Sequence, residues 1–430
     1  MEQTVSAATR LSGTLELPAD KSISHRAAMF AALADGTSVI GGFSDAADPQ
    51  STLKCLRQLG VPIRHEDQKV IIRGVGRHGL RSPGQLLDCG NSGTTMRLLS
   101  GIIGGAGIEA TLVGDNSLSR RPMRRIIDPL QSMGIAIQAQ DDNFPPLHIS
   151  RKGPLKPIRF DLPIASAQLK SCVLLAGLFG DNPTEVIEHL PSRDHTERLL
   201  GLQIHDKDDG RIIISEGSQF IPTQNYQVPG DFSAAAFWLV AGSIVPDSHI
   251  ALKEVGINPT RSSALNILER MGASIRMERE HLAGAEPVAD LVVDYHDLKA
   301  TVIHPEEVPN CIDEIPILAV AMAFAEGESR IEGAAELRFK ESDRLKAVAE
   351  FLQEAGIQVL ERKDGLVIHG NGGAPVNAAR FNSYDDHRIA MAAGILALRS
   401  DSPSIIEKAE CVSISYPAFW NNLTNLTNSR

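Results

Sequence analysis

The chain has few cysteines and no long apolar run, and both shortages exclude classes of protein. Its five cysteines (Cys55, Cys89, Cys172, Cys311 and Cys411) are scattered and form no CxxC pair. This argues against a disulfide framework or a zinc knuckle and favours a reducing cytoplasm. No apolar stretch approaches the roughly 18 residues of a membrane span, and the first residues lack the pattern of a secretory signal. We therefore expect a cytoplasmic protein that is neither exported nor membrane-bound.

A surplus of positive charge is also missing. The 430 residues include 42 Lys and Arg against 53 Asp and Glu, a balance of −11. That balance opposes non-specific binding to nucleic acid, so any anionic ligand must use a local cationic patch. The contents of 43% hydrophobic and 22% charged residues are typical of a folded globular chain, and the length suggests two or three domains.

One pattern recurs six times at intervals of roughly 70 residues. An extended segment and a turn precede a helix rich in alanine and glycine, and a second, amphipathic helix ends in a glycine before more β structure. The first helices are expected near residues 22–36, 92–105, 166–180, 231–246, 312–327 and 385–398. Because they are apolar nearly all round, we expect them to be buried.

The repeats predict an α/β fold of two similar domains. Each domain would hold three βαβαββ units, with buried parallel helices surrounded by sheets. We place one domain at residues 21–229 and the other at residues 1–20 plus 230–430. The N-terminal strand then crosses into the second domain, which predicts a hinge near residue 20 and residues 228–233.

The informative polar residues cluster at the starts of these helices, in the segments DKSISHR, GNSGTTMR, IASAQ, FKESDR and YDDHR. Helix starts favour anions because their backbone N–H groups are unpaired and the helix dipole is positive there. Parallel buried helices would bring these starts to one end of each domain. The sequence therefore predicts a positive focus for small phosphorylated or carboxylated molecules.

Simpler interpretations remain open at this point. Asn91, Ser92 and Asp385 can be plain helix caps, and Lys340, Glu341 and Arg344 can form a solvated ion network on one helix. The RRPMRR segment can be a basic surface turn. His25, His195 and His387 show no metal-ligand spacing, so we expect no metal. Recurrence at equivalent places in the repeats favours a functional site.

Taken in order, these segments resemble the 5-enolpyruvylshikimate-3-phosphate synthase family. The resemblance extends nearly end to end and rests on DKSISHR at 20–26, GNSGTTMR at 90–97, RRPM at 120–123, SAQLKS at 166–171, SRDHT at 192–196, Asp313, KESDR at 340–344 and DDHR at 385–388. It implies transfer of the enolpyruvyl group of phosphoenolpyruvate to shikimate 3-phosphate, with no cofactor. We expect a monomer with small-molecule substrates only.

The resemblance also implies roles for individual residues. Shikimate 3-phosphate is expected to contact Lys21, Ser22, Arg26, Ser166, Ala167, Gln168, Ser192, Asp313 and Lys340. Phosphoenolpyruvate is expected to contact Lys21, Gly93, Thr94, Arg121, Gln168, Arg344 and Arg388. The catalytic candidates are Asp313 as the base for the 5-hydroxyl, and Lys21 and Glu341 for proton delivery and removal at the methylene.

Two positions depart from part of the family. Ile414 stands where some members carry a lysine, and Ala167 replaces a serine that other members have. Both changes resemble a second bacterial subgroup. Gly93 is retained at a place where some members insensitive to glyphosate carry alanine, which predicts inhibition by glyphosate.

Two alternatives to this function stay open. One is the sister enolpyruvyl transferase that acts on a UDP-amino sugar, although the GDNSLSRRPM segment lacks the cysteine typical of that enzyme. The other is a non-catalytic anion-binding protein of the same architecture. The acid and base candidates Lys21, Asp313 and Glu341 favour an enzyme over simple binding.

Overall fold

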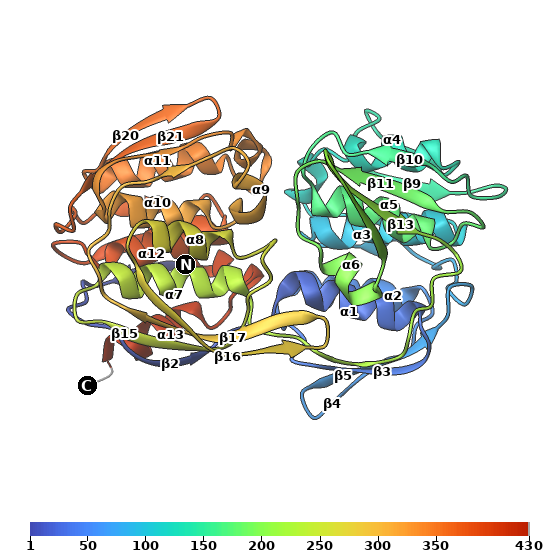
Figure 1. Ribbon diagram of the computed structural model, residues 1–430, viewed down its shortest axis with the longest axis horizontal. Helices are drawn as coiled ribbons and strands as arrows, with labels where there is room; N and C mark the ends of the chain where they lie inside the picture. The colour runs from blue at the N-terminus through green and yellow to red at the C-terminus, as the bar shows by residue number, and fades with distance from the viewer. Residues whose placement is uncertain (429–430) are drawn as a thin grey trace. The chain divides into compact units, whose positions relative to one another are not determined.

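The computed structural model describes residues 1–428, which divide into two compact units (Figure 1). The N-terminal unit contains Ala19–Val228 together with Ala283–Glu286, and the described part of the C-terminal unit contains Met1–Pro18, Pro229–Leu282 and residues 287–428. The chain passes between the units at residues 18–19 and 228–229, and again on either side of residues 283–286. The hinge near residue 20 and residues 228–233 stays a prediction.

The N-terminal unit is built from three repeats that each contribute one four-stranded sheet. The sheet orders are β14-β3-β5-β4, β6-β7-β9-β8 and β10-β11-β13-β12. The elements are α1 (Lys21–Leu33), β3 (Asp35–Gly41), α2 (Ala47–Gln58), β4 (Ile63–Glu66), β5 (Lys69–Val75), β6 (Leu87–Asp88), α3 (Gly93–Ala106), β7 (Ala110–Val113), η1 (Leu118–Arg120), α4 (Arg124–Ser132), β8 (Ala136–Gln140), β9 (Phe144–Ser150), β10 (Arg159–Asp161), α5 (Ala167–Gly177), β11 (Thr184–Glu188), α6 (His195–Leu200), β12 (Gln203–Lys207), β13 (Gly210–Ser215) and β14 (Asn225–Gln227).

The C-terminal unit repeats the same plan with sheets β16-β17-β15-β2, β18-β19-β21-β20 and the three-stranded β1-β23-β22. Its elements are β1 (Glu2–Val5), β2 (Ser12–Glu16), α7 (Phe232–Ile244), β15 (His249–Gly256), α8 (Ser263–Arg270), β16 (Ser274–Ala283), β17 (Glu286–Asp294), β18 (Val302–Ile303), α9 (Val308–Cys311), α10 (Ile315–Phe324), β19 (Glu326–Ile331), η2 (Ala335–Phe339), α11 (Arg344–Glu354), β20 (Gln358–Arg362), β21 (Gly365–Asn371), β22 (Arg380–Asn382), α12 (His387–Ala397), β23 (Ser404–Glu407), η3 (Ala409–Ile414) and α13 (Phe419–Asn428).

Two strands are exchanged between the repeats that flank the unit boundary. β2 leads directly into α1 but pairs in parallel with β15 of the C-terminal unit. β14 leads into α7 but pairs in parallel with β3 of the N-terminal unit. In the last repeat β1 pairs antiparallel with β23, which is the place that the second strand of a hairpin takes in the other repeats. The chain's first strand therefore completes its last repeat.

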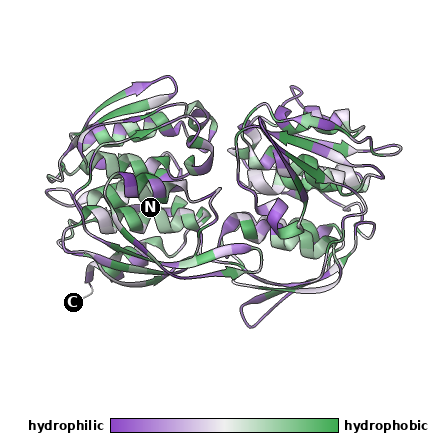
Figure 2. Ribbon diagram, viewed as in Figure 1, coloured by the Kyte–Doolittle hydropathy of each residue, from purple (hydrophilic) through white to green (hydrophobic). Residues whose placement is uncertain are grey.

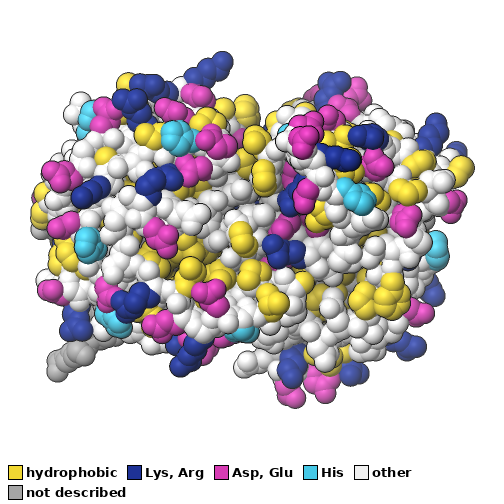
Figure 3. All heavy atoms as spheres, viewed as in Figure 1, with side chains coloured by type: hydrophobic (Ala, Val, Ile, Leu, Met, Phe, Trp, Pro, Cys, Tyr) yellow, Lys and Arg dark blue, Asp and Glu magenta, His cyan; other side chains and the backbone are white. Residues whose placement is uncertain are grey.

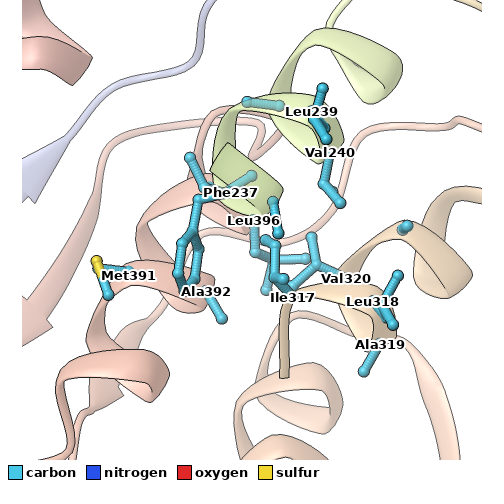
Figure 4. Packing of buried hydrophobic residues seen from close by; sticks show 14 of the residues in the cluster. Phe237, Leu239, Val240, Ile317, Leu318, Ala319, Val320, Met391, Ala392 and Leu396 are labelled. Carbon is cyan, nitrogen blue, oxygen red and sulfur yellow. The ribbon is translucent and has the colours of Figure 1, made fainter. Parts of the chain in front are cut away.

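The inner helices of each unit are buried because their sequences are apolar on every face. All residues of α7 and α10 are buried, and hydrophobic colour dominates both helices in Figure 2. Phe237 of α7, Ile317 of α10 and Leu396 of α12 meet in one cluster (Figure 4). In the N-terminal unit α1, α3 and α5 form the equivalent core. The α/β class with buried helices, predicted from the repeats, is confirmed.

Candidate active site

Lys21 is the first residue of α1 and lies beside a carboxylate from the next helix. Its Nζ is 2.9 Å from Oδ2 of Asp48 on α2, and about one fifth of its side chain is exposed. Asp20 caps the helix by accepting a hydrogen bond of 2.8 Å from the Ile23 N–H. The predicted catalytic ammonium thus sits at a helix start with a fixed carboxylate next to it.

The starts of α3 and α5 are joined by the Gln168 side-chain amide. Its Nε2 donates to Thr94 Oγ1 at 3.0 Å, and its Oε1 accepts from Arg97 Nη1 at 2.7 Å. Gly93 opens α3 against two guanidinium groups, because an added Cβ would lie 2.8 Å from Arg97 Nη1 and 3.4 Å from Arg121 Nη1. Three residues predicted to contact phosphoenolpyruvate, namely Gly93, Thr94 and Gln168, are therefore neighbours.

Arg121 is tied to the same place through Asn91. Its Nη2 donates to Asn91 Oδ1 at 3.0 Å, and Asn91 Nδ2 donates to Asp115 Oδ2 at 2.8 Å. Ser92, rather than Asn91, caps α3 by accepting from the Thr95 N–H at 3.1 Å. Asn91 therefore orients an arginine instead of capping the helix. The RRPM segment, which the sequence left open as a surface turn, brings Arg121 to the start of α3.

Arg26 is buried and bound on three sides by its own unit. Its Nε donates to Thr196 Oγ1 at 2.7 Å, its Nη2 to Ser171 Oγ at 2.9 Å and its Nη1 to the Ser22 carbonyl at 3.1 Å. Burial lowers the pKa of Arg26 to about 10, against the opposing charge of Glu197. The guanidinium therefore stays charged at neutral pH and links α1 to α5 and α6.

The serines predicted to contact shikimate 3-phosphate differ in their surroundings. Ser166 caps α5 by accepting from the Leu169 N–H at 3.4 Å, and Ser166 and Ala167 are both partly exposed. Ser192 is buried, and its hydroxyl donates to Glu188 Oε1 at 2.5 Å. Ser166 is open to a ligand, whereas the Ser192 hydroxyl is turned into the unit.

In the C-terminal unit Asp313 precedes α10 and faces three cations. Its Oδ1 lies 3.4 Å from Arg344 Nη1 and 3.9 Å from Lys340 Nζ, and its Oδ2 lies 3.8 Å from Arg388 Nη2. Arg388 also donates to the Asp313 carbonyl at 2.9 Å. The structure therefore brings together the three predicted cations of this unit around the candidate base.

Arg344 is the most tightly held of these cations. Its Nε donates to Asp386 Oδ2 at 2.8 Å, and its Nη2 donates to Glu341 Oε2 at 2.6 Å. Burial alone would lower the pKa of Arg344, but the charges of Asp386 and Glu341 outweigh it and raise that pKa. Burial likewise lowers the pKa of Lys340, with Asp313 opposing the shift. The ion network that the sequence left open does not lie on one helix, because α11 begins at Arg344 and Lys340 and Glu341 precede it; Arg344 is buried, whereas the other two are partly exposed.

The charged residues around Asp313, Glu314 and Arg344 form what we call the C-terminal cluster. Several of its members carried no signal in the sequence. Arg261 Nη1 donates to Glu314 Oε1 at 2.9 Å, and its Nη2 lies 3.2 Å from Oδ1 of Asp231, the cap of α7. Ser233 also donates to Glu314. Nothing in the NPTRSS segment distinguishes Arg261 from a surface residue, because its partners Asp231 and Glu314 lie 30 and 53 residues away along the chain.

The predicted positive focus is wrong for the C-terminal cluster. Its four cations (Arg261, Lys340, Arg344 and Arg388) are matched by five carboxylates (Asp231, Asp313, Glu314, Glu341 and Asp386). Helix starts carry acidic caps as readily as basic side chains, and the caps offset the cations. On the face shown in Figure 3, basic and acidic side chains are likewise interspersed over each unit.

Ile414 leaves the expected lysine position apolar. Its partly buried side chain packs against the core of the C-terminal unit. The nearby exposed cation, Lys408, is engaged by Asp385 at 2.6 Å. Asp386, not Asp385, caps α12, since it accepts from the Arg388 N–H at 2.9 Å.

Comparison with known proteins identifies the family of the chain. The sequence model described as EPSP synthase (3-phosphoshikimate 1-carboxyvinyltransferase) matches residues 5–423. The chain belongs to the EPSP synthase family. A 3-phosphoshikimate 1-carboxyvinyltransferase from Salinibacter ruber is 50% identical, covering 99% of this chain and all of that protein. One from Syntrophomonas wolfei is 46% identical over the same shares of the two chains.

Solved structures agree with this assignment. The EPSP synthase of Acinetobacter baumannii superimposes with a TM-score of 0.88 at 40% identity, covering 99% of this chain and 98% of that one. The enolpyruvyl transferase NikO from Streptomyces tendae shares the fold, with a TM-score of 0.75 at 18% identity, covering 98% of this chain and 96% of that one. The family, the two-domain fold and the enzyme class predicted from the sequence are confirmed.

Residues 1–428 contain neither a candidate membrane span nor a candidate metal site. No helix there is long and apolar enough to cross a membrane. No group of three or more His, Cys, Asp or Glu side chains within that range is arranged to hold a metal ion.

Proposed function

We propose that the clusters of both units take part in the reaction of this family. In that reaction the enolpyruvyl group of phosphoenolpyruvate passes to the 5-hydroxyl of shikimate 3-phosphate, and inorganic phosphate leaves. Two observations in particular support the proposal. Lys21 is set at a helix start beside Asp48, and Asp313 lies within 4 Å of three cations.

Shikimate 3-phosphate binds to the N-terminal unit through the starts of α1 and α5. Ser22 and Ser166 offer hydroxyls at partly exposed positions, and Arg26 adds a buried positive charge behind them. Ala167 and Gln168 offer the first backbone N–H groups of α5, which favour an anion. Ser192, whose hydroxyl donates to Glu188, takes part through the position of the loop between β11 and α6 on which it lies. Lys340 and Asp313 of the C-terminal unit are the remaining contacts that the resemblance implies.

Phosphoenolpyruvate uses the start of α3. Gly93 has no Cβ, so an anion can approach the start of α3 and the backbone N–H of Thr94 closely, while the Gly93 N–H donates to the Asn91 carbonyl at 3.1 Å. Arg121, held by Asn91, supplies the guanidinium beside them. Lys21, Gln168, Arg344 and Arg388 supply further donors to a ligand that carries both a phosphate and a carboxylate.

The reaction requires proton transfers at two places. Asp313 accepts the proton of the 5-hydroxyl as that oxygen bonds to the substituted vinyl carbon of phosphoenolpyruvate. The methylene carbon gains a proton from Lys21 or Glu341, which gives a tetrahedral adduct. Loss of that proton and departure of phosphate restore the double bond. Positioned acids and bases of this kind contribute about 10²–10⁴-fold to a rate.

The sister reaction on a UDP-amino sugar is the alternative to exclude by experiment. Purified protein is incubated with phosphoenolpyruvate and either shikimate 3-phosphate or UDP-N-acetylglucosamine, and the products are separated and identified by mass. We expect the enolpyruvyl ether of shikimate 3-phosphate and no product from the sugar nucleotide. Product from the sugar nucleotide alone would overturn the proposal.

A further inference from the structure

A lysine that the reaction does not use lies at the centre of the N-terminal unit. The side chain of Lys170 on α5 has no exposed surface. Three oxygens surround its Nζ: Glu188 Oε1 at 2.7 Å, Glu197 Oε1 at 2.7 Å and the Ser192 carbonyl at 3.2 Å. These partners come from β11, α6 and the loop between them. The ammonium thus joins three elements that are distant from it in sequence.

Glu188 extends this contact along the loop. Its Oε1 also accepts from the Ser192 N–H at 2.9 Å and from the Ser192 hydroxyl at 2.5 Å, while its Oε2 accepts from Arg211 Nε at 2.7 Å. The backbone N–H, the carbonyl and the hydroxyl of Ser192 are therefore all bound by the pair of Lys170 and Glu188. The position of this loop depends on the pair.

The residues next to this pair hold Arg26. Ser171 follows Lys170 and accepts from Arg26 Nη2, while Thr196 precedes Glu197 and accepts from Arg26 Nε. The two hydroxyls also share a hydrogen bond of 2.7 Å. A shift of α5 relative to α6 would therefore move the guanidinium of Arg26 together with the Ser192 loop.

Stability alone does not account for a charged group at this position. Burying an ammonium and two carboxylates carries a large desolvation cost, and apolar residues of similar volume often stabilise a core as well or better. The charged groups do fix the positions of their partners, because charge-assisted hydrogen bonds set the geometry of the groups that they join. Here the groups so fixed are two of the predicted contacts of shikimate 3-phosphate.

We propose that Lys170 is a positioning residue for shikimate 3-phosphate, acting with Glu188 and Glu197 to hold the Ser192 loop and Arg26 in the geometry that binds this substrate. The proposal rests on the proposed function, and it concerns binding of one substrate rather than proton transfer. Loss of the ammonium should weaken binding of shikimate 3-phosphate and leave the chemical step largely intact.

The test measures binding of shikimate 3-phosphate alone by isothermal titration calorimetry with wild type and Lys170→Met. Folding of each protein is checked by circular dichroism. We expect a dissociation constant about 10- to 100-fold higher for the variant, the range for one lost charge-assisted contact. In steady-state kinetics the KM for shikimate 3-phosphate should rise, while kcat and the KM for phosphoenolpyruvate change little.

Lys253→Met is the matched control. Lys253 also pairs with a buried carboxylate, Asp290 Oδ2 at 2.7 Å, but it lies on β15 of the C-terminal unit, and neither residue of this pair is a predicted substrate contact. We expect it to leave affinity for shikimate 3-phosphate unchanged. If Lys170→Met does not fold, Glu188→Gln keeps the side-chain shape and should give the same split between KM and kcat.

Three outcomes overturn the proposal. They are unchanged affinity for shikimate 3-phosphate in a folded variant at position 170 or 188, a fall in kcat with unchanged affinity, and an equal effect of Lys253→Met. A wild-type protein that does not bind shikimate 3-phosphate at all would overturn the proposed function instead, so the two failures can be told apart.

Discussion

Arg344 and Asp386 form a buried ion pair, with Nε and Oδ2 2.8 Å apart and side chains 1% and 0% exposed. Removing one partner of such a pair leaves an uncompensated buried charge, which costs about 3–5 kcal/mol. We expect Asp386→Asn to lower the stability of the C-terminal unit by that order and to reduce turnover, because Arg344 loses its orientation. Chemical denaturation followed by circular dichroism measures the change.

The neighbouring residue provides the control for this substitution. Asp385 pairs with Lys408 at 2.6 Å, but both side chains are about half exposed or more. Exposed pairs contribute little, so Asp385→Asn should leave stability and turnover near wild type. Equal losses from the two substitutions would contradict the account of the Arg344 environment.

Lys21→Met should reduce turnover by about 10²–10⁴-fold, the contribution typical of a positioned acid or base. The substitution removes the charge beside Asp48 but keeps the apolar stem, so the fold should persist. Lys54→Met is the control, because Lys54 also pairs with an aspartate, Asp88 at 3.1 Å, in an exposed setting. Steady-state kinetics measure the turnover of both variants. Full activity of a folded Lys21→Met protein would exclude Lys21 from the mechanism.

Asp313→Asn and Glu341→Gln should separate binding from chemistry. Both changes keep the side-chain shape and remove the basic oxygen, so turnover should fall by about 10²-fold or more while shikimate 3-phosphate still binds. Calorimetry gives the affinity and a phosphate-release assay gives the rate. Glu278→Gln, which changes an exposed glutamate of the same unit, should have no effect. Normal turnover in both test variants would show the proposed proton transfers to be wrong.

Gly93→Ala should weaken inhibition by glyphosate more than it weakens use of phosphoenolpyruvate. The added methyl would approach Arg97 Nη1 to 2.8 Å, so it must displace a guanidinium that binds Gln168. One methyl in a close-fitting site changes affinity by about 10-fold or more, and the longer inhibitor should be affected first.

The control for this glycine is Gly84→Ala, where an added Cβ meets nothing within 4 Å. Inhibition curves are compared at matched saturation with phosphoenolpyruvate. We expect glyphosate to inhibit Gly84→Ala as strongly as wild type and to inhibit Gly93→Ala less. Equal sensitivity of the two variants to glyphosate would show that Gly93 is not part of the site.

His25 should make the protein less stable as the pH falls below about 6.5. Burial lowers the pKa of His25 to about 3, with Asp48 opposing the shift. The unfolded chain therefore takes up a proton that the folded chain refuses, and stability is lost from about pH 6.5 downward. His25→Gln should flatten this dependence between pH 6.5 and 4.5 in denaturation experiments. The exposed His65→Gln should keep the wild-type slope, and identical slopes for all three proteins would contradict the prediction.

The repeats and the buried helices could be predicted because their signals are local. The apolar run of α10 and the capping residues before α3 and α5 are written in consecutive residues. The sequence did predict that the N-terminal strand crosses into the second domain, but the pairing of β14 with β3 and the use of β1 to complete the last repeat depend on contacts across hundreds of residues. No local pattern distinguishes these strands from ordinary ones.

The same limit applies to the site. Motifs identified Lys21, Gly93 and Arg344 by resemblance, but not the partners that orient them. Arg261 pairs with Glu314 of the next repeat and Lys170 pairs with carboxylates elsewhere in its own repeat, and a single sequence does not show which of these charges meet in the core. The predicted positive focus failed for a related reason, since a list of cations ignores the acidic caps folded against them.

Release of inorganic phosphate from phosphoenolpyruvate, followed continuously with and without shikimate 3-phosphate, is the most direct test of the proposed reaction. Purified protein should release phosphate only when both substrates are present, in a one-to-one ratio with the enolpyruvyl ether. Lys21→Met should slow this release by about 10²–10⁴-fold. Release that does not depend on shikimate 3-phosphate, or no release from folded wild-type protein, would contradict the proposed reaction.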